Sequence, residues 1–114
     1  MSDHIMAMTT VGDEPTAVRL AHALLERRLV ACVNVVARVR SFYRWKGTIE
    51  EDDEHLLLMK TREECFDALR TAFDELHPYD VPELIALPIQ NGSAAYLGWV
   101  DENVRPGNTK VPEK

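Results

Sequence analysis

The chain has 114 residues, of which 46% are hydrophobic and 28% are charged. That length builds one hydrophobic core without room for a second domain, and the composition argues against a disordered protein. The 19 acidic and 13 basic residues give a formal net charge of −6, which argues against nucleic-acid binding because phosphate recognition needs a basic face. We expect a single domain over residues 1–104. Two prolines, a glycine and an asparagine mark residues 105–114 as a flexible tail.

Cysteine usage and hydropathy point to a cellular compartment. Two cysteines are too few for a disulfide scaffold. The first ten residues lack the basic end and long apolar run of a signal peptide, and no apolar stretch approaches the roughly 20 residues of a membrane helix. The sequence therefore predicts a cytoplasmic protein with reduced thiols and no membrane partner.

The chain begins with a strand and a helix. Residues 4–10 form a short apolar run, which Gly12 and Asp13 interrupt. Over residues 14–28 the apolar side chains fall on one face of a helix, and Asp13 is suited to cap its first turn. We therefore predict a buried strand followed by an amphipathic helix.

A long hairpin follows. Apolar and polar residues alternate over residues 31–45, Lys46 and Gly47 predict a turn, and residues 48–61 return as a second strand. Arms of about 15 residues at roughly 3.3 Å each span about 50 Å, whereas a domain of this size is roughly 35 Å across. The hairpin therefore either bends at a bulge or packs on another subunit. Three aromatic side chains near its tip favour a second subunit: Phe42, Tyr43 and Trp45.

The second half predicts a helix, a strand and a final helix. The segment Thr61-Arg62-Glu63-Glu64 has the pattern of a capping box, and the helix after it ends before Pro78. Residues 84–87 form a short strand between two prolines, and residues 94–100 form a short C-terminal helix. The whole order predicts an α+β fold, a ferredoxin-like βαββαβ sandwich with an extended central β-hairpin.

Three segments resemble the CutA family of divalent-cation tolerance proteins. They are RRLVACVNVV (27–36), SFYRWKGTIEEDDEHLLLMKTR (41–62) and HPYDVPE (77–83), and YLGW (96–99) is similar to the family's final helix. The resemblance implies a ferredoxin-like homotrimer assembled through the long hairpins, similar in architecture to the trimeric PII signalling proteins. It also implies a role in tolerance to divalent metals, especially copper. One departure is Ala37, where the family often carries proline.

Cys32 and His77 are the candidate metal ligands. Cys32 matches the family's cysteine in ACVN, and a thiolate is a soft ligand suited to Cu(I) and zinc. The alternative for Cys32 is a buried small hydrophobe, which is also the expected role of Cys65. His77 follows a predicted helix end, where histidine either caps carbonyl groups or ligates a metal.

A small-ligand pocket is predicted around the loop after His77. Tyr79, Asp80 and Glu83 follow closely in this loop, and Glu54 and Lys60 match polar positions of the family's second hairpin strand. Lys60 either contacts an anion at the next helix N-terminus or extends to water.

The N-terminus offers a separate copper site. If Met1 is removed, the free amine, two amide nitrogens and the imidazole of His4 form a square plane of the kind that Cu(II) prefers. The alternative is that His4 simply begins the first strand.

We expect a homotrimer that binds copper or another divalent cation and holds no organic cofactor. The alternative is a PII-like signalling module that binds a small anionic metabolite or a protein partner, and a structural trimer with an indirect metal effect is a third hypothesis. Enzyme motifs such as a Gly-rich phosphate loop, HExxH, CxxC or a nucleophile elbow are absent from the sequence. The chain is therefore not expected to be an enzyme.

Overall fold

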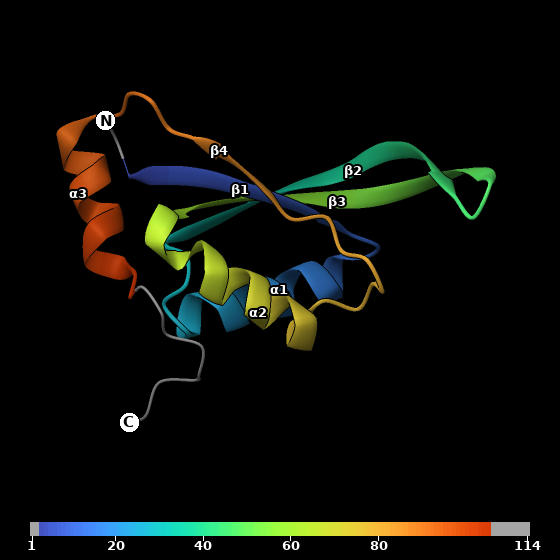
Figure 1. Cartoon of the computed structure of the whole chain (residues 1–114), viewed down its shortest axis with the longest axis horizontal. Helices are drawn as coiled ribbons and strands as arrows, with labels where there is room; N and C mark the ends of the chain where they lie inside the picture. The colour runs from blue at the N-terminus through green and yellow to red at the C-terminus, as the bar shows by residue number, and fades with distance from the viewer. Residues whose placement is uncertain (1–2, 106–114) are drawn as a thin grey trace.

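A computed structural model describes residues 3–105 of the chain and contains one antiparallel sheet with the strand order β2-β3-β1-β4. Helices α1 and α2 cover one face of this sheet, and α3 lies at the end away from the hairpin tip (Figure 1). The predicted ferredoxin-like α+β fold is confirmed. The elements are β1 His4–Val11, α1 Glu14–Glu26, β2 Cys32–Trp45, β3 Thr48–Arg62, α2 Phe66–Leu76, β4 Ile85–Pro88 and α3 Ala94–Asn103. Residues 106–114 of the predicted tail lie outside the described residues.

The main core lies between the two helices and the sheet. Alternate residues of β1 and β3 point toward the helices, and α1 begins where Asp13 Oδ1 accepts a hydrogen bond from the Thr16 amide at 2.8 Å, as predicted. Each fully buried Leu or Phe side chain contributes about 1.5–3 kcal/mol to folding. Its large members include Val11, Leu24, Leu29, Leu57, Met59, Leu69 and Phe73.

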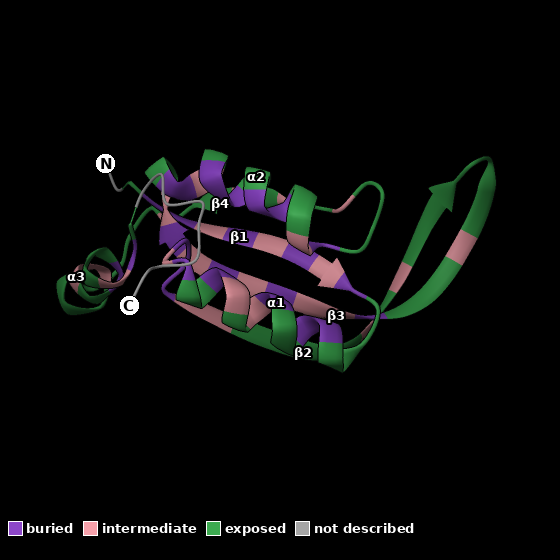
Figure 2. Ribbon diagram, turned by 90° about the horizontal axis from the view of Figure 1, so that it is seen from below, coloured by how far each residue is buried: buried purple, intermediate pink, exposed green. Residues whose placement is uncertain are grey.

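The long hairpin contains a β-bulge, which is one of the two predicted alternatives for its length, and the alternation of β2 shifts by one residue there. Val36 pairs with Leu56 and Val39 pairs with Glu54, so Ala37 and Arg38 together face one residue of β3. Arg38 has a φ of 66°, and a bulge of this kind bends a ribbon and increases its twist. Figure 2 shows the exposed distal ribbon projecting away from the helix-covered part of the sheet.

The tip of the hairpin is the predicted two-residue turn. Trp45 pairs with Thr48 across it, and Lys46 and Gly47 have φ values of 52° and 84°. Positive φ at both central residues is typical of a type I′ turn, whose twist matches that of the two strands. Opposite charges pair across the two strands: Arg40 with Glu51, and Arg38 with Asp53.

The predicted capping box is wrong. Thr61 is fully buried within β3, and its hydroxyl donates to the Leu29 carbonyl at 2.7 Å instead of capping a helix. A short 3₁₀ turn, Glu63–Cys65, precedes α2, and its cap residue Arg62 makes no side-chain capping bond. Thr61 therefore joins β3 to the segment after α1.

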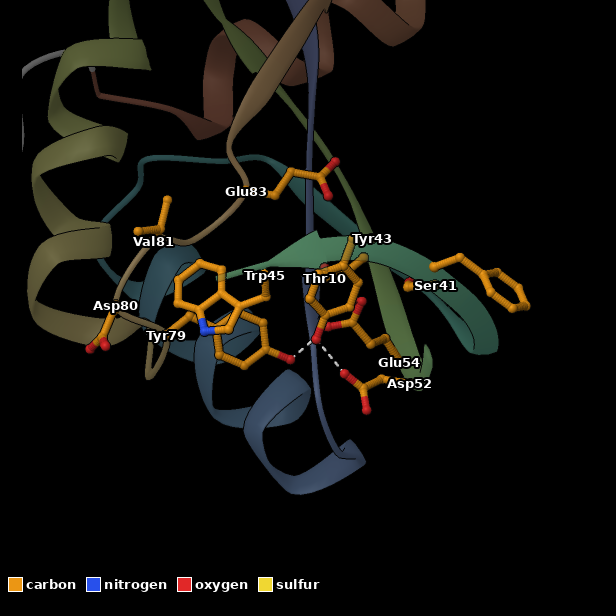
Figure 3. A pocket seen from close by; sticks show the side chains of 11 residues that line it. Thr10, Ser41, Tyr43, Trp45, Asp52, Glu54, Tyr79, Asp80, Val81 and Glu83 are labelled. Atoms are coloured by element: carbon orange, nitrogen blue, oxygen red, sulfur yellow. Dashed lines mark hydrogen bonds between the residues drawn. The ribbon is translucent and has the colours of Figure 1, made fainter. Parts of the chain in front are cut away.

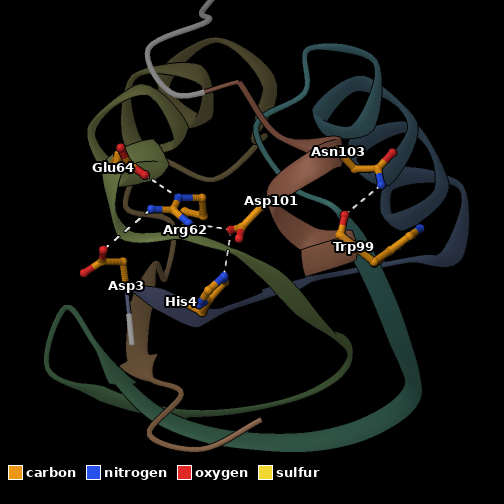
Figure 4. A network of polar contacts seen from close by, with 7 residues as sticks. All are labelled: Asp3, His4, Arg62, Glu64, Trp99, Asp101 and Asn103. Carbon is orange, nitrogen blue, oxygen red and sulfur yellow. Dashed lines mark hydrogen bonds and ion pairs between the residues drawn. The ribbon is translucent and has the colours of Figure 1, made fainter. Parts of the chain in front are cut away.

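Helix α3 is tied to the start of β1 by a charged network (Figure 4). Asp101 Oδ1 lies 2.8 Å from His4 Nε2 and also accepts a hydrogen bond from Arg62. Arg62 pairs in addition with Glu64 and with Asp3, the latter at 3.6 Å. The helix continues to Asn103, three residues beyond its predicted end. Within residues 3–105, no helix is long and apolar enough to cross a membrane.

The sheet face opposite α1 and α2 is apolar, and we call it the open face. Residues directly opposite one another in an antiparallel pair share a face, and Met8 pairs with both Leu58 and Ile85 while Met6 pairs with Leu87. Ile85 and Leu87 are each 48% exposed. Its apolar residues are Met6, Met8, Val36, Leu56, Leu58, Ile85 and Leu87, and Cys32, Asn34 and Lys60 lie on the same face.

Candidate functional site

A cavity of about 620 Å³ lies where the distal hairpin, the end of β1 and the loop between α2 and β4 meet (Figure 3). Aromatic side chains from both the hairpin and the loop line it, among them Tyr43, Trp45 and Tyr79. Among the described residues that line the cavity none is basic, and four are carboxylates: Asp52, Glu54, Asp80 and Glu83. This lining is suited to a cation rather than to an anion.

Glu54 and Tyr79 form the buried side of the cavity. Glu54 pairs with the first residue after the bulge, Val39, and is only 6% exposed. The Tyr79 hydroxyl donates to Glu54 Oε2 at 2.6 Å. Burial, followed by this hydrogen bond to a carboxylate, raises the pKa of Tyr79. The phenol therefore stays protonated and acts as a donor at neutral pH.

Tyr43 and Asp52 form a similar pair on the hairpin. The Tyr43 hydroxyl donates to Asp52 Oδ2, and this hydrogen bond, followed by burial, raises the pKa of Tyr43 to about 12. Two phenols thus donate to two carboxylates on the same side of the hairpin. From the sequence, Tyr43 and Trp45 were expected to pack on a second subunit, and Asp52 was not predicted as a pocket residue. The sequence signal for this pair was an aromatic strand end, residues 42–45, joined through one turn to the acidic residues 50–54 of the next strand.

His77 positions the loop from beneath the cavity. Its Nδ1 accepts a hydrogen bond from the Tyr79 amide at 3.2 Å, so Nε2 carries the proton and donates to the Thr10 carbonyl at 3.0 Å. Nε2 also lies 3.1 Å from Thr9 Oγ1. The ring is 7% exposed and packs against Phe73 and Tyr79. Burial lowers the pKa of His77, which favours a neutral structural imidazole.

Cys32 and Lys60 lie elsewhere, on the open face. They pair directly across β2 and β3, Lys60 donates to Asn34 Oδ1, and Cys32 Sγ lies 3.6 Å from the same oxygen. Lys60 is six residues from Glu54 along β3, which is about 20 Å of extended chain. The structure therefore places Glu54, Tyr79 and Glu83 around the cavity, as the predicted pocket requires, but leaves Lys60 outside its lining.

The two candidate metal ligands do not lie together in one chain. Cys32 is on the open face, whereas His77 contacts Thr9, whose fully buried side chain points toward the helices. Within the part of the chain that the structure describes, no group of three or more His, Cys, Asp or Glu side chains is placed to hold a metal ion. Cys65 is fully buried, and burial raises the pKa of its thiol.

His4 is the first residue of β1 and is 8% exposed. Its Nε2 contacts Asp101 at 2.8 Å, so the imidazole already joins β1 to α3. Met1 and Ser2, which the predicted N-terminal copper site needs, lie outside the described residues. The position of His4 agrees with the alternative that this residue begins the first strand.

Comparison with known proteins identifies the family to which the sequence is similar. The model of the CutA1 divalent ion tolerance protein family matches residues 5–103. The divalent-cation tolerance protein CutA of Thermus thermophilus is 48% identical over 98 residues, which are 86% of this chain and 95% of that protein. Mouse protein CutA is 42% identical over 93% of this chain, but the match spans only 62% of the mouse protein.

Solved structures give the same result. The crystal structure of CutA1 from Oryza sativa has a TM-score of 0.88 at 41% identity and covers 91% of this chain and 95% of that one. The Thermus thermophilus CutA1 structure has a TM-score of 0.87 at 46% identity and covers 90% and 99%. With matches across nearly all of its described length, the chain belongs to the CutA1 divalent ion tolerance family.

Proposed function

We propose that this protein is a homotrimer that binds a small cation in the acidic cavity. The observation that carries the proposal is the lining, which presents four carboxylates and, among its described residues, no basic side chain. The same lining does not favour the alternative of a small anionic metabolite, since Lys60, the cation expected to hold it, lies outside. Membership of a divalent ion tolerance family supports a role in the response to cations.

The trimer is supported by the open face and the distal hairpin. Seven apolar side chains line the open face, and Ile49 on the hairpin, outside the cavity lining, is 66% exposed. Contiguous apolar surface of this kind marks an interaction site in a protein of ordinary composition. A second copy of the same chain is the natural occupant, and the resemblance to CutA proteins implies three copies.

Copper is the second candidate ligand, with Cys32 as its anchor. Cys32 is partly exposed, in contrast to the fully buried Cys65, and a thiolate is the soft ligand that Cu(I) prefers. Both ring nitrogens of His77 are engaged with Tyr79 and with the end of β1, which makes His77 the weaker candidate. Cytoplasmic localisation and the absence of enzymatic activity stay predictions from the sequence.

The cation site is tested by titrating three forms of the full chain in a Cys32→Ser background, which removes binding through the thiol. The unaltered cavity, Glu54→Gln and the control Asp53→Asn are each titrated with magnesium, zinc, copper and choline chlorides by calorimetry. Asp53 is the neighbouring carboxylate on β3, pairs with Arg38 and does not line the cavity. We expect Glu54→Gln to weaken binding of at least one cation tenfold while Asp53→Asn leaves it unchanged. Equal affinity in all three forms for every cation would overturn the proposal.

A further inference from the structure

We propose that the cavity binds a small organic ammonium ion rather than a bare metal ion. This inference rests on the proposed function, in which the cavity is the cation site, and it names the chemical class of the ligand. Three features of the cavity carry it: its size, its aromatic walls and an incompletely satisfied buried carboxylate.

The size of the cavity fits a molecule rather than an ion. Its volume is about 620 Å³, whereas a water molecule occupies about 30 Å³ in the liquid and small-molecule sites span roughly 300–1,000 Å³. The four carboxylates are spread around this space, and the described residues contain no group of three ligating side chains close enough to hold a metal ion. A metal ion here would leave most of the cavity to water.

The walls of the cavity are aromatic. Trp45 and Tyr43 come from the end of β2, and Tyr79 comes from the loop after α2. An ammonium group within about 6 Å of such a ring is attracted by its negative face, and tryptophan is the most favourable ring. The hydrogen bonds to Asp52 and Glu54 fix the two tyrosine rings in the lining. The bulge at Ala37 and Arg38 bends the strand that carries Tyr43 and Trp45.

Glu54 supplies the charge at the base of the cavity. It is only 6% exposed, and among the described residues its carboxylate accepts one hydrogen bond, from Tyr79. An ionised carboxylate offers about four acceptor sites, and a buried charge is costly unless it is paired. No basic side chain among the described lining residues neutralises it. A ligand cation that enters the cavity provides the missing countercharge while its alkyl groups contact the rings.

The test compares two ligands of the same shape and different charge. Choline carries a quaternary nitrogen, and 3,3-dimethylbutan-1-ol replaces that nitrogen by carbon. Of the two tryptophans in the chain, Trp99 lies in α3 and Trp45 lines the cavity. A Trp99→Phe background therefore makes the fluorescence report on the cavity alone, and calorimetry gives the dissociation constants. We expect choline to bind at least tenfold more tightly than the alcohol and to change the Trp45 fluorescence.

Two substitutions assign the binding to the cavity. Glu54→Gln and Asp52→Asn should each weaken choline binding about tenfold, whereas Asp53→Asn, outside the lining, should not. Asp52 is exposed, so its variant keeps the test valid if Glu54→Gln fails to fold. Equal affinity for choline and the alcohol would overturn the inference. A metal ion that binds through Glu54 where choline does not would also overturn the inference, but it would support the proposed cation site. If no cation of either class binds through Glu54, both proposals are wrong.

Discussion

Tyr79 donates its phenolic hydrogen to Glu54 Oε2 across 2.6 Å, and this bond joins the loop after α2 to β3 at the base of the long hairpin. The two residues are 25 positions apart in the sequence, and the bond closes the buried side of the cavity. Because His77 accepts a hydrogen bond from the Tyr79 amide and donates to the Thr10 carbonyl, the loop is held from two directions. The cavity is thus built from segments that only the fold brings together.

Tyr79→Phe removes the single described hydrogen bond to the Glu54 carboxylate and keeps the aromatic ring. Leaving a buried acceptor unpaired costs about 1–3 kcal/mol, so we expect the free energy of unfolding to fall by that amount in urea titration. The control is Tyr96→Phe in α3, a residue that is 40% exposed against 37% for Tyr79 and whose hydroxyl lies against Cys32 instead of a buried carboxylate. A loss of equal size in both variants would show that the bond to Glu54 does not stabilise the fold.

The pH dependence of stability should report on His77. Burial lowers its pKa in the folded protein, whereas the unfolded chain titrates near 6.5. Between these two values the unfolded state binds more protons, so stability is complete above about pH 6.5 and falls as the pH decreases toward the folded pKa. We expect His77→Gln to flatten this decline between pH 7 and pH 5 in urea titrations. His22→Gln, at an exposed position of α1, is the control and should keep it. An unchanged slope in His77→Gln would contradict the argument.

The fold was accessible from the sequence because its signals are local. Alternation predicted the strands, the Lys46 and Gly47 turn was recognised by residue type, and Asp13 was recognised as a helix cap. The position of the bulge was harder to predict because Arg38 adopts a positive φ, which is uncommon for residues other than glycine. Thr61 has the pattern of a cap, but burial in β3 and its bond to Leu29 override that local preference.

The site was only partly predictable because its members belong to distant segments. Tyr79 and Glu83 were predicted as pocket residues from polar groups on a stiff loop, and Glu54 from its match to a polar position of the family's hairpin strand; all three line one cavity in the structure. Lys60 was predicted to join them, but six residues of extended strand separate it from Glu54 in β3. Trp45 was missed because the bulge shifts the alternation of β2 by one residue. Asp52 was missed because only the folded hairpin places its carboxylate against the Tyr43 hydroxyl.

A charged residue on the open face should dissociate the proposed trimer. Ile85→Asp places a carboxylate among apolar side chains that are covered in the proposed assembly, so the mass from light scattering should fall from roughly three times 13.0 kDa toward one chain. Val18→Asp is the matched control, since Val18 is 46% exposed on α1 and Ile85 is 48% exposed. A stable folded monomer of the unaltered chain at micromolar concentration would contradict the trimer.

Cys32 and Cys65 should respond differently to replacement by serine. Cys32 is partly exposed on the open face, so Cys32→Ser should leave the thermal midpoint nearly unchanged and lower Cu(I) uptake by about one equivalent per chain. Cys65 is fully buried beside Ala31, Val100 and Val104, so Cys65→Ser introduces a hydroxyl into an apolar cluster. This should cost about 1–3 kcal/mol of stability and leave Cu(I) uptake unchanged. Uptake is measured by competition with a colorimetric Cu(I) chelator, and stability by thermal unfolding followed by circular dichroism. If Cys32→Ser lowers the midpoint and Cu(I) uptake persists, the thiol is a packing residue and copper binds elsewhere.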